Sequence, residues 1–188
     1  MIIDCSTTLQ SFLTERSMQG MNDESVDMLE KIIRSCWEKG VTVQLDPELI
    51  EASGTYNSTA NTITFGKPAL DDNEVLIDTA QHEFVHVLHD QADGLHNSEL
   101  STLGIPSTQR AENLVENAYS SSDHDVKELE IEAHSAEDFL ANPESETYLR
   151  QTSIEEHLAI AYTAQGMDPI DAALQASSDS FELELFLI

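Results

Sequence analysis

The segment His82-Glu83-Phe84-Val85-His86 is the most informative stretch of this chain. In a helix, side chains four residues apart lie on one face, so His82 and His86 can bind a single metal ion with Glu83 at the edge of that face. The run Asn73 to Gln91 favours such a helix, because its polar and apolar residues fall on opposite sides at ~100° per residue. The apolar side comprises Leu76, Ile77, Ala80, Phe84, Val87 and Leu88. The alternative is a solvated helix on which two His and a Glu coincide.

The chain is strongly acidic. Its 188 residues contain 8 Lys and Arg against 36 Asp and Glu, which gives a formal net charge of −28, and 40% of the residues are hydrophobic. A hydrophobic content of this size supports a folded core, and the length suits one domain. The negative field repels nucleic acid and anionic membranes, so we expect neither as a partner. A solvated acidic surface explains the charge more simply than a charge-specific function does.

The two cysteines, Cys5 and Cys36, are not in a metal-binding spacing. We expect free thiols in a reducing compartment. The residues Met1 to Cys5 contain neither a basic region nor a continuous apolar region, so no export signal is apparent. No apolar run approaches the ~18 residues of a membrane helix. These features predict a cytoplasmic protein.

The residues before the motif predict one helix and a small sheet. The run Asn22 to Lys39 has apolar residues at helical spacing, with Asn22 or Asp23 as a cap and Gly40 as the end. Val41 to Leu45 alternates as a half-buried strand does, and the limbs Ser53 to Tyr56 and Asn61 to Phe65 predict a hairpin that is closed by Gly66-Lys67-Pro68.

The residues after the motif are mostly helical in pattern. An irregular stretch, Leu95 to Thr108, precedes the predicted helices, which are 109–119, 124–140, 153–165 and 169–176. The tail, Phe181 to Ile188, alternates acidic and apolar residues and predicts a strand or a frayed end. The fold class expected is α+β, with a small mixed or antiparallel sheet and hairpin packed on the motif helix, followed by a mostly helical C-terminal half.

Two histidines do not complete a catalytic zinc site, which usually has three protein ligands and a water. The third histidine of an HExxHxxGxxH pattern is missing, because His89 stands at the Gly position and Ala92 at the last His position. The other common solution is a Glu from a later helix. Glu130 and Glu132 flank the apolar stripe of the run 124–140 almost symmetrically, so periodicity leaves both open. Weaker candidates in less regular surroundings are Glu99 and Glu112.

The segment Glu130-Ile131-Glu132-Ala133-His134 resembles the E-x-x-A-[D/N] pattern of gluzincin-type zinc metallopeptidases, in which the Glu is the third zinc ligand. The chain is also similar to small, largely uncharacterised bacterial or phage HExxH proteins. The resemblance covers roughly residues 54–140. It implies that Glu130 binds the metal, with Glu132 as the alternative third ligand. His134 replaces the usual Asp or Asn, a position from which a side chain can orient a zinc-bound imidazole.

The resemblance also implies a zincin-like fold. One domain, 1–188, would place a helix, strands and the HExxH helix in residues 22–93 and a mainly helical half, which supplies the third ligand, in residues 94–188. In zincin folds the strand before the motif helix is often a sheet edge, so we expect Thr62 to Phe65 to border the cleft and to pair with an extended substrate. A purely structural hairpin is the alternative.

The function implied is that of a zinc-dependent metallopeptidase with one Zn²⁺ per chain and a peptide or protein substrate. His82, His86 and Glu130 would hold the ion, and Glu83 would be the general base that deprotonates the attacking water. His134 and His89 are candidates for orienting the ligands or lining the cleft. The residues that could stabilise an oxyanion are not ranked: they are Tyr56, Tyr119, His89, His96 and His134. The alternatives are a catalytically silent zincin-like metal-binding or interaction protein and a plain acidic protein without metal.

Overall fold

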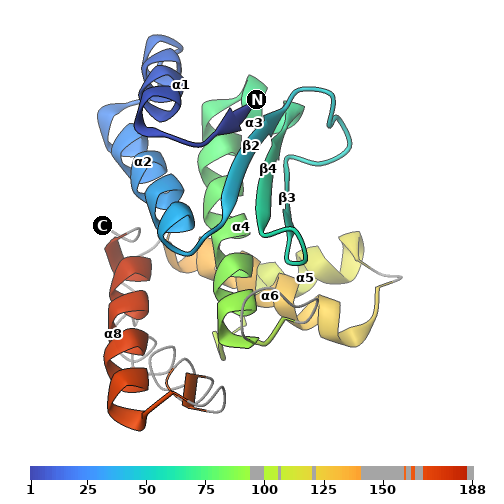
Figure 1. Ribbon diagram of the computed structural model, residues 1–188. Coiled ribbons are helices and arrows are strands. Elements are labelled where there is room, and N and C mark those ends of the chain that lie inside the picture. The colour runs from blue at the N-terminus through green and yellow to red at the C-terminus, as the bar shows by residue number, and fades with distance from the viewer. Residues whose placement is uncertain are drawn as a thin grey trace. The chain divides into compact units, whose positions relative to one another are not determined.

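The computed structural model describes residues 1–93, 100–105, 107–119, 122–140, 159, 162–163 and 167–185 (Figure 1). The chain forms two compact units, Met1–Val87 and Leu88–Ile188. The described part is mixed α and β, as predicted: a small four-stranded mixed sheet lies in the first unit, and helices make up most of the rest. No described helix has the length and apolar character needed to cross a membrane.

The sheet contains four strands in the order β1-β2-β4-β3. The strands are β1 (Ile2–Ile3), β2 (Thr42–Asp46), β3 (Gly54–Asn57) and β4 (Thr62–Gly66). β2 runs parallel to β4, whereas β1 with β2 and β3 with β4 are antiparallel pairs. The predicted strand and hairpin are therefore confirmed.

The prediction that Thr62 to Phe65 forms a sheet edge is wrong. This segment is β4, which lies between β2 and β3, and four of its five residues are buried. The edge next to it is β3, whose residues are half-buried or exposed. Sequence periodicity did not reveal this order, because β4 pairs in parallel with β2, a partner that precedes it by 20 residues (62 − 42).

The helix α2 (Asp23–Glu38) has the ends that were predicted. The Asn22 side chain accepts the backbone N–H of Ser25 at 2.8 Å, and Gly40 follows the helix with φ 75°. Its apolar face is buried, and the indole N–H of Trp37 donates to the Ile3 carbonyl at 2.9 Å. This bond ties the helix to β1.

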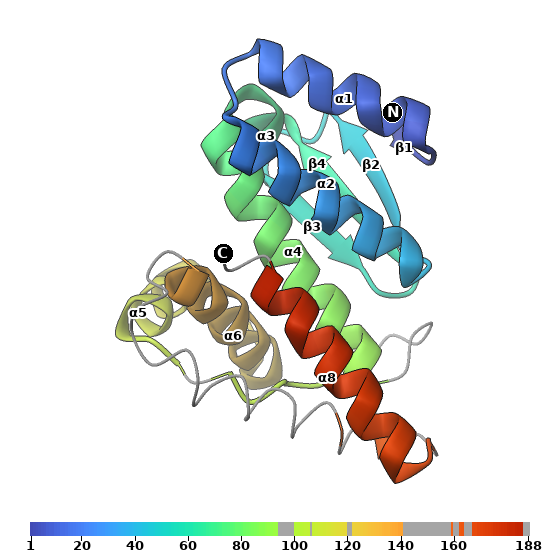
Figure 2. The ribbon, with the colours of Figure 1, turned by 90° about the vertical axis from the view of Figure 1, so that its left-hand side faces the viewer.

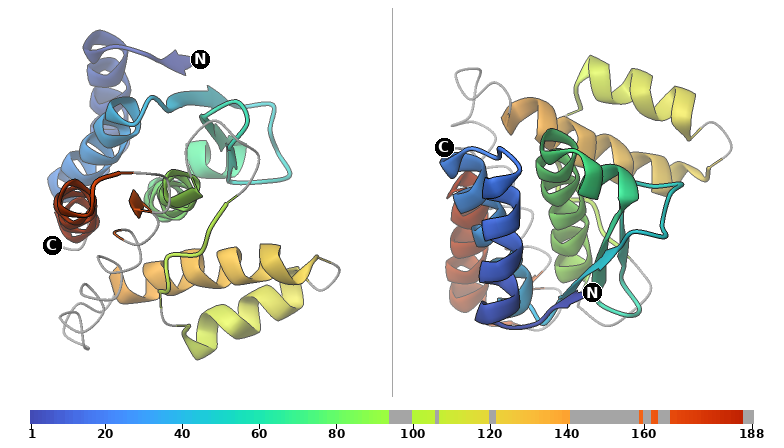
Figure 3. Two further views of the ribbon diagram at one scale, coloured as in Figure 1. Left: turned by 60° about the horizontal axis from the view of Figure 1, so that its bottom comes forward. Right: turned by 90° about the horizontal axis from the view of Figure 1, so that it is seen from above.

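Three elements of the first unit were not predicted: β1, α1 (Ser6–Met18) and α3 (Lys67–Asp71). The buried stripe of α1 includes a charged residue, Arg16, whose guanidinium donates to the Leu70 carbonyl at 2.8 Å. An arginine inside the stripe hides the apolar periodicity. Gly66-Lys67-Pro68 does not simply close the hairpin, because α3 begins at Lys67. Figure 3 shows α1 beside α2, which it contacts.

The second unit contains α5 (Gln109–Ala118), α6 (His124–Leu140) and α8 (Pro169–Leu185). These helices confirm the predictions for 109–119, 124–140 and 169–176, and α5 packs along α6 (Figure 2). The predicted strand or frayed tail is wrong over Phe181–Leu185, because α8 continues through these residues. Extending an existing helix adds one hydrogen bond per residue, which outweighs a short alternating pattern. The helix predicted at 153–165 lies largely outside the described residues. The irregular stretch predicted at 95–108 is confirmed over its described residues, 100–105 and 107–108, which form neither helix nor strand.

Candidate metal centre

The HExxH motif lies on α4 (Asn73–Asp93), which begins at Asn73 as expected and continues two residues beyond Gln91. The Asp72 carboxylate accepts the backbone N–H groups of Glu74 and Val75 at 2.9 and 3.3 Å and so caps the first turn. In the first unit, four residues of the apolar face are at most 1% exposed: Leu76, Ala80, Phe84 and Val87. Burial of this face fixes the rotation of the helix, and the motif residues lie around its other side.

His82 and His86 lie close enough to share one metal ion. Their Nε2 atoms are 3.1 Å apart, and the rings meet edge to face with centroids 4.8 Å apart. Two nitrogens bound to one tetrahedral zinc at ~2.0–2.1 Å are separated by about 3.3 Å. The separation of the two nitrogens is therefore compatible with one shared zinc ion. The same distance also suits a hydrogen bond between the rings, with one Nε2 carrying the proton.

Glu83 is buried, with 6% of its surface exposed. Its side chain lies against the backbone of Gly54, the first residue of the edge strand β3. The Glu83 side chain therefore lies between α4 and the sheet edge, next in sequence to the first histidine of the pair. In an HExxH motif this Glu is the candidate for the general base.

Glu132, the alternative third ligand, anchors a loop of the second unit. Its carboxylate accepts the backbone N–H groups of Leu103, Gly104 and Ile105 at 2.7, 2.7 and 3.0 Å. Its Oε2 also lies 3.0 Å from Nε2 of His89, which is fully buried. Ligation of a metal by Glu132 would break these contacts and leave buried N–H groups without an acceptor. His89 is likewise part of this internal network.

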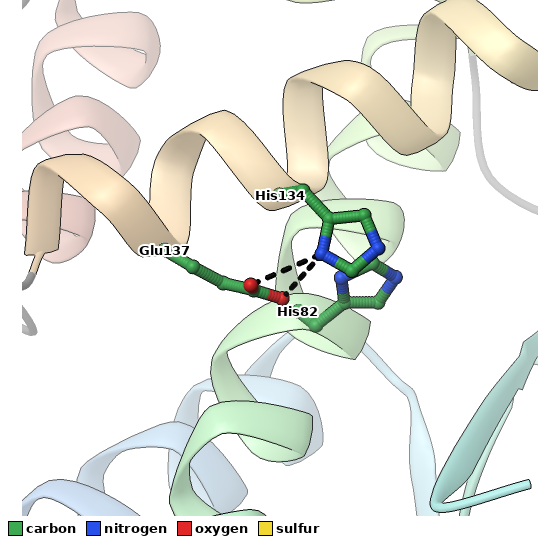
Figure 4. A group of neighbouring side chains, drawn as sticks. All are labelled: His82, His134 and Glu137. Carbon is green, nitrogen blue, oxygen red and sulfur yellow. Dashed lines mark hydrogen bonds and ion pairs between the residues drawn. The ribbon is translucent and has the colours of Figure 1, made fainter. Parts of the chain in front are cut away.

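Glu130 lies on a different face of α6. At ~100° per residue, Glu130 shares its face with His134 and Glu137, four and seven positions later. Two of these three side chains are in contact: Nδ1 of His134 lies 3.0 Å from both carboxylate oxygens of Glu137, as Figure 4 shows. Arg110 of α5 approaches the same carboxylate at 3.7 Å. A carboxylate on Nδ1 fixes the tautomer of an imidazole and directs its Nε2, as in the outer contacts of metal-binding histidines.

The remaining candidates have ordinary roles or lie outside the described residues. Glu112 accepts hydrogen bonds from Ser107 and Gln109 at the exposed start of α5. The Tyr56 hydroxyl donates to the Asn61 side chain at 2.8 Å. The exposed start of α6 gathers three possible ligands, His124, Asp125 and Glu128, as acidic surfaces commonly do. Outside the described residues are Glu99 and His96.

Sequence reasoning missed two residues of this region. Glu137 follows Glu130 by two helical turns, so the periodicity of 124–140 contained the signal. Gly54 stands at the start of a strand, where a glycine often marks a close approach of the backbone to another element. Neither residue belongs to the HExxH or E-x-x-A pattern, which is why a motif search passes over them.

No protein-family model matches the chain, and no similar curated protein or solved structure was found. The functional argument therefore depends on the donor atoms themselves. Those described in the first unit are two imidazoles at zinc-binding separation and an adjacent buried carboxylate.

Proposed function

We propose that this protein is a zincin-like, zinc-dependent metallopeptidase of the gluzincin type, in which His82, His86 and Glu130 bind one zinc ion. The observation that carries the proposal is the 3.1 Å separation of the His82 and His86 Nε2 atoms on a helix that also presents Glu83. Nitrogen and carboxylate donors are the ligands that zinc takes in such enzymes. The donor set therefore fits the ion.

Glu130 is the third ligand in this proposal because of what Glu132 does. Glu132 stabilises the loop Leu103–Ile105 and contacts His89, so its loss from this network would be costly. Glu130 lies on a different face of α6 from Glu132, and it is the residue that matches the Glu of the E-x-x-A pattern. His134, four positions later, would then lie beside the ion with its Nδ1 fixed by Glu137.

The chemistry follows from the roles of these side chains. A bound zinc ion polarises a carbonyl and lowers the pKa of water toward ~7. Glu83 accepts the proton of the attacking water and passes it to the leaving amine. The backbone of β3 lies beside Glu83 at the sheet edge, where an extended peptide can pair with a strand. The correction of the strand order thus moves the proposed substrate edge from β4 to β3.

The first experiment is elemental analysis of protein that is purified without added zinc. Wild type, Glu130→Gln and Glu132→Gln are compared, with Glu128→Gln as a control on an exposed position of the same helix. We expect one zinc per chain in wild type, Glu132→Gln and Glu128→Gln, and a loss in Glu130→Gln. A wild-type protein that neither contains zinc nor binds it when supplied would refute the metal site.

Catalysis is tested separately from metal binding. Glu83→Gln keeps the size of the side chain and removes the base, so we expect full zinc content and loss of peptide hydrolysis. A catalytically silent metal-binding or interaction protein would instead bind zinc and show no hydrolysis that depends on Glu83. Screening a peptide library with wild type and Glu83→Gln distinguishes a metallopeptidase from a catalytically silent zinc-binding protein.

The acidic surface gives one expectation for substrates. A net charge of −28 attracts basic peptides over long range and repels acidic ones. We expect basic library members to be cleaved faster than acidic ones at low ionic strength. The difference should shrink when salt shortens the screening length to about 8 Å near 0.15 M. A difference that persists at high salt would show that contacts at the site set the preference.

A further inference from the structure

The backbone of Gly54 lies so close to α4 that a side chain at position 54 would collide with the helix. An ideal Cβ built on Gly54 would lie 2.4 Å from the Cγ2 methyl of Thr79 and 3.1 Å from both Cγ and Oε1 of Glu83. Cβ atoms in proteins essentially never approach another heavy atom to under 3.0 Å. Thr79 and Glu83 are four residues apart, so they form one continuous surface of α4 against which the strand lies.

Space, and not backbone conformation, requires this glycine. The described glycines with positive φ are Gly20, Gly40 and Gly104, so Gly54 is not among them. At Gly20 and Gly40, by contrast, a Cβ would meet nothing within 4 Å. A side chain at position 54 would therefore be acceptable to the backbone but would collide with α4.

We infer that Gly54 is a positioning residue for Glu83. The inference rests on the proposed function, in which Glu83 is the general base. Glu83 is buried against the bare backbone of β3, and any Cβ at position 54 would displace the carboxylate by a few tenths of an ångström or more. Small displacements of a reacting group lower turnover steeply, by as much as ~100-fold for 1 Å. Gly54 thus sets the place of the base by the space that its missing side chain leaves.

The test separates the contact with Thr79 from the contact with Glu83. Gly54→Ala alone meets both residues and is expected to lower stability and turnover. Thr79→Ser removes the methyl group that lies 2.4 Å away, so the double variant Gly54→Ala/Thr79→Ser keeps only the 3.1 Å contacts with Glu83. We expect the double variant to recover most of the thermal stability while kcat stays about 10-fold or more below that of Thr79→Ser. Zinc content and KM should match those of Thr79→Ser.

Two controls complete the design. Gly20→Ala also replaces a glycine, at a position where a Cβ meets open space but φ is 92°, and it measures the cost of backbone strain without a collision with α4. If the double variant stays unstable, adding Glu83→Ala removes both remaining close atoms, and recovery of stability would confirm that Glu83 is the obstacle.

A double variant that regains turnover together with stability would overturn the inference and leave Gly54 as a packing residue. A Gly54→Ala variant with wild-type kcat would overturn it as well. Failure of the proposed function has a different signature: wild-type protein itself would lack zinc, or would hydrolyse no peptide in a manner that depends on Glu83.

Discussion

Glu132 Oε2 lies 3.0 Å from Nε2 of His89, and both side chains are buried. The same carboxylate holds three consecutive backbone N–H groups of the loop that precedes α5. Glu132 is therefore a structural anchor of the second unit, and its neighbour by two positions, Glu130, is the proposed ligand. The two glutamates look equivalent in sequence, but replacing Glu132 should lower stability, whereas replacing Glu130 should lower zinc binding.

Replacing Glu132 should destabilise the protein. Glu132→Ala leaves three N–H groups without their acceptor, two of them buried and that of Gly104 partly buried, at about 1–3 kcal/mol for each buried group that finds no other partner. We expect the free energy of unfolding in urea to fall by about 3–5 kcal/mol. Glu128→Ala, on an exposed position of the same helix, should change it by less than about 0.5 kcal/mol. Equal effects of the two substitutions would contradict the anchoring role.

Zinc should stabilise the folded protein through the two motif histidines. A ligand that binds only the native state adds about 2.7 kcal/mol at 100 times its Kd. We expect Tm to rise on addition of zinc, to return on addition of EDTA, and to be insensitive to zinc in His86→Ala. Because ligating imidazoles must be neutral, the rise should diminish at acid pH. His124→Ala removes an exposed histidine and should keep the full zinc response.

The contact between His134 and Glu137 should matter for the proposed site. Glu137→Gln weakens the hold on Nδ1 of His134, and loss of such an outer contact typically lowers metal affinity or activity about 10–100-fold. Competition with a chromophoric chelator measures the metal affinity, and a peptide-hydrolysis assay measures the activity. Arg110→Gln is the matched control, because Arg110 is 59% exposed and 3.7 Å from the carboxylate. If both variants match wild type, His134 has no part in the site.

The two thiols should differ sharply in reactivity. Cys36 is buried, and burial raises its pKa to about 12. Cys5 is exposed, and hydrogen bonding from Thr8 lowers its pKa. Because the thiolate is the reactive form, Ellman's reagent should label one thiol in the native protein and a second only after unfolding. Cys5→Ser should show no native labelling, and rapid labelling of that variant would contradict the burial of Cys36.

The buried thiol also gives the fold a dependence on pH. Between the ordinary pKa of 9.0 and about 12, Cys36 ionises in the unfolded chain but stays protonated in the folded one. The unfolded state then binds fewer protons, so stability falls as the pH rises, by about 1.4 kcal/mol per unit. Cys36→Ala lacks this contribution. The difference in unfolding free energy between wild type and Cys36→Ala should narrow above pH 9.

Local pattern was sufficient to predict most of the helices and the hairpin. Helix α2 has a complete set of local signals: Asn22 as cap, a regular apolar stripe and Gly40 at its end. Helix α1 lacked them, because Arg16 occupies a place in its buried stripe. The position of β4 inside the sheet depends on β2, a strand that is distant in sequence, so no local signal encodes it.

The candidate site also has features that the local sequence predicts and others that it does not. The helical spacing of His82 and His86 is local, and the structure places their Nε2 atoms at zinc-binding separation. The choice between Glu130 and Glu132 is not local, because a symmetric stripe leaves both open. The proposal of Glu130 instead depends on the loop Leu103–Ile105, more than 25 residues before Glu132, whose backbone N–H groups donate to the Glu132 carboxylate.

The order of the strands also bears on how copies of this protein behave at high concentration. The two edges of the sheet are β1, with two residues, and β3, with four. Strand-to-strand association between molecules needs a long unpaired edge, and short edge strands are a common protection against it. Near the pI of about 4.1 the repulsion between copies disappears, but the short edges remain. We therefore expect any precipitate formed there to be amorphous and to give no thioflavin T signal.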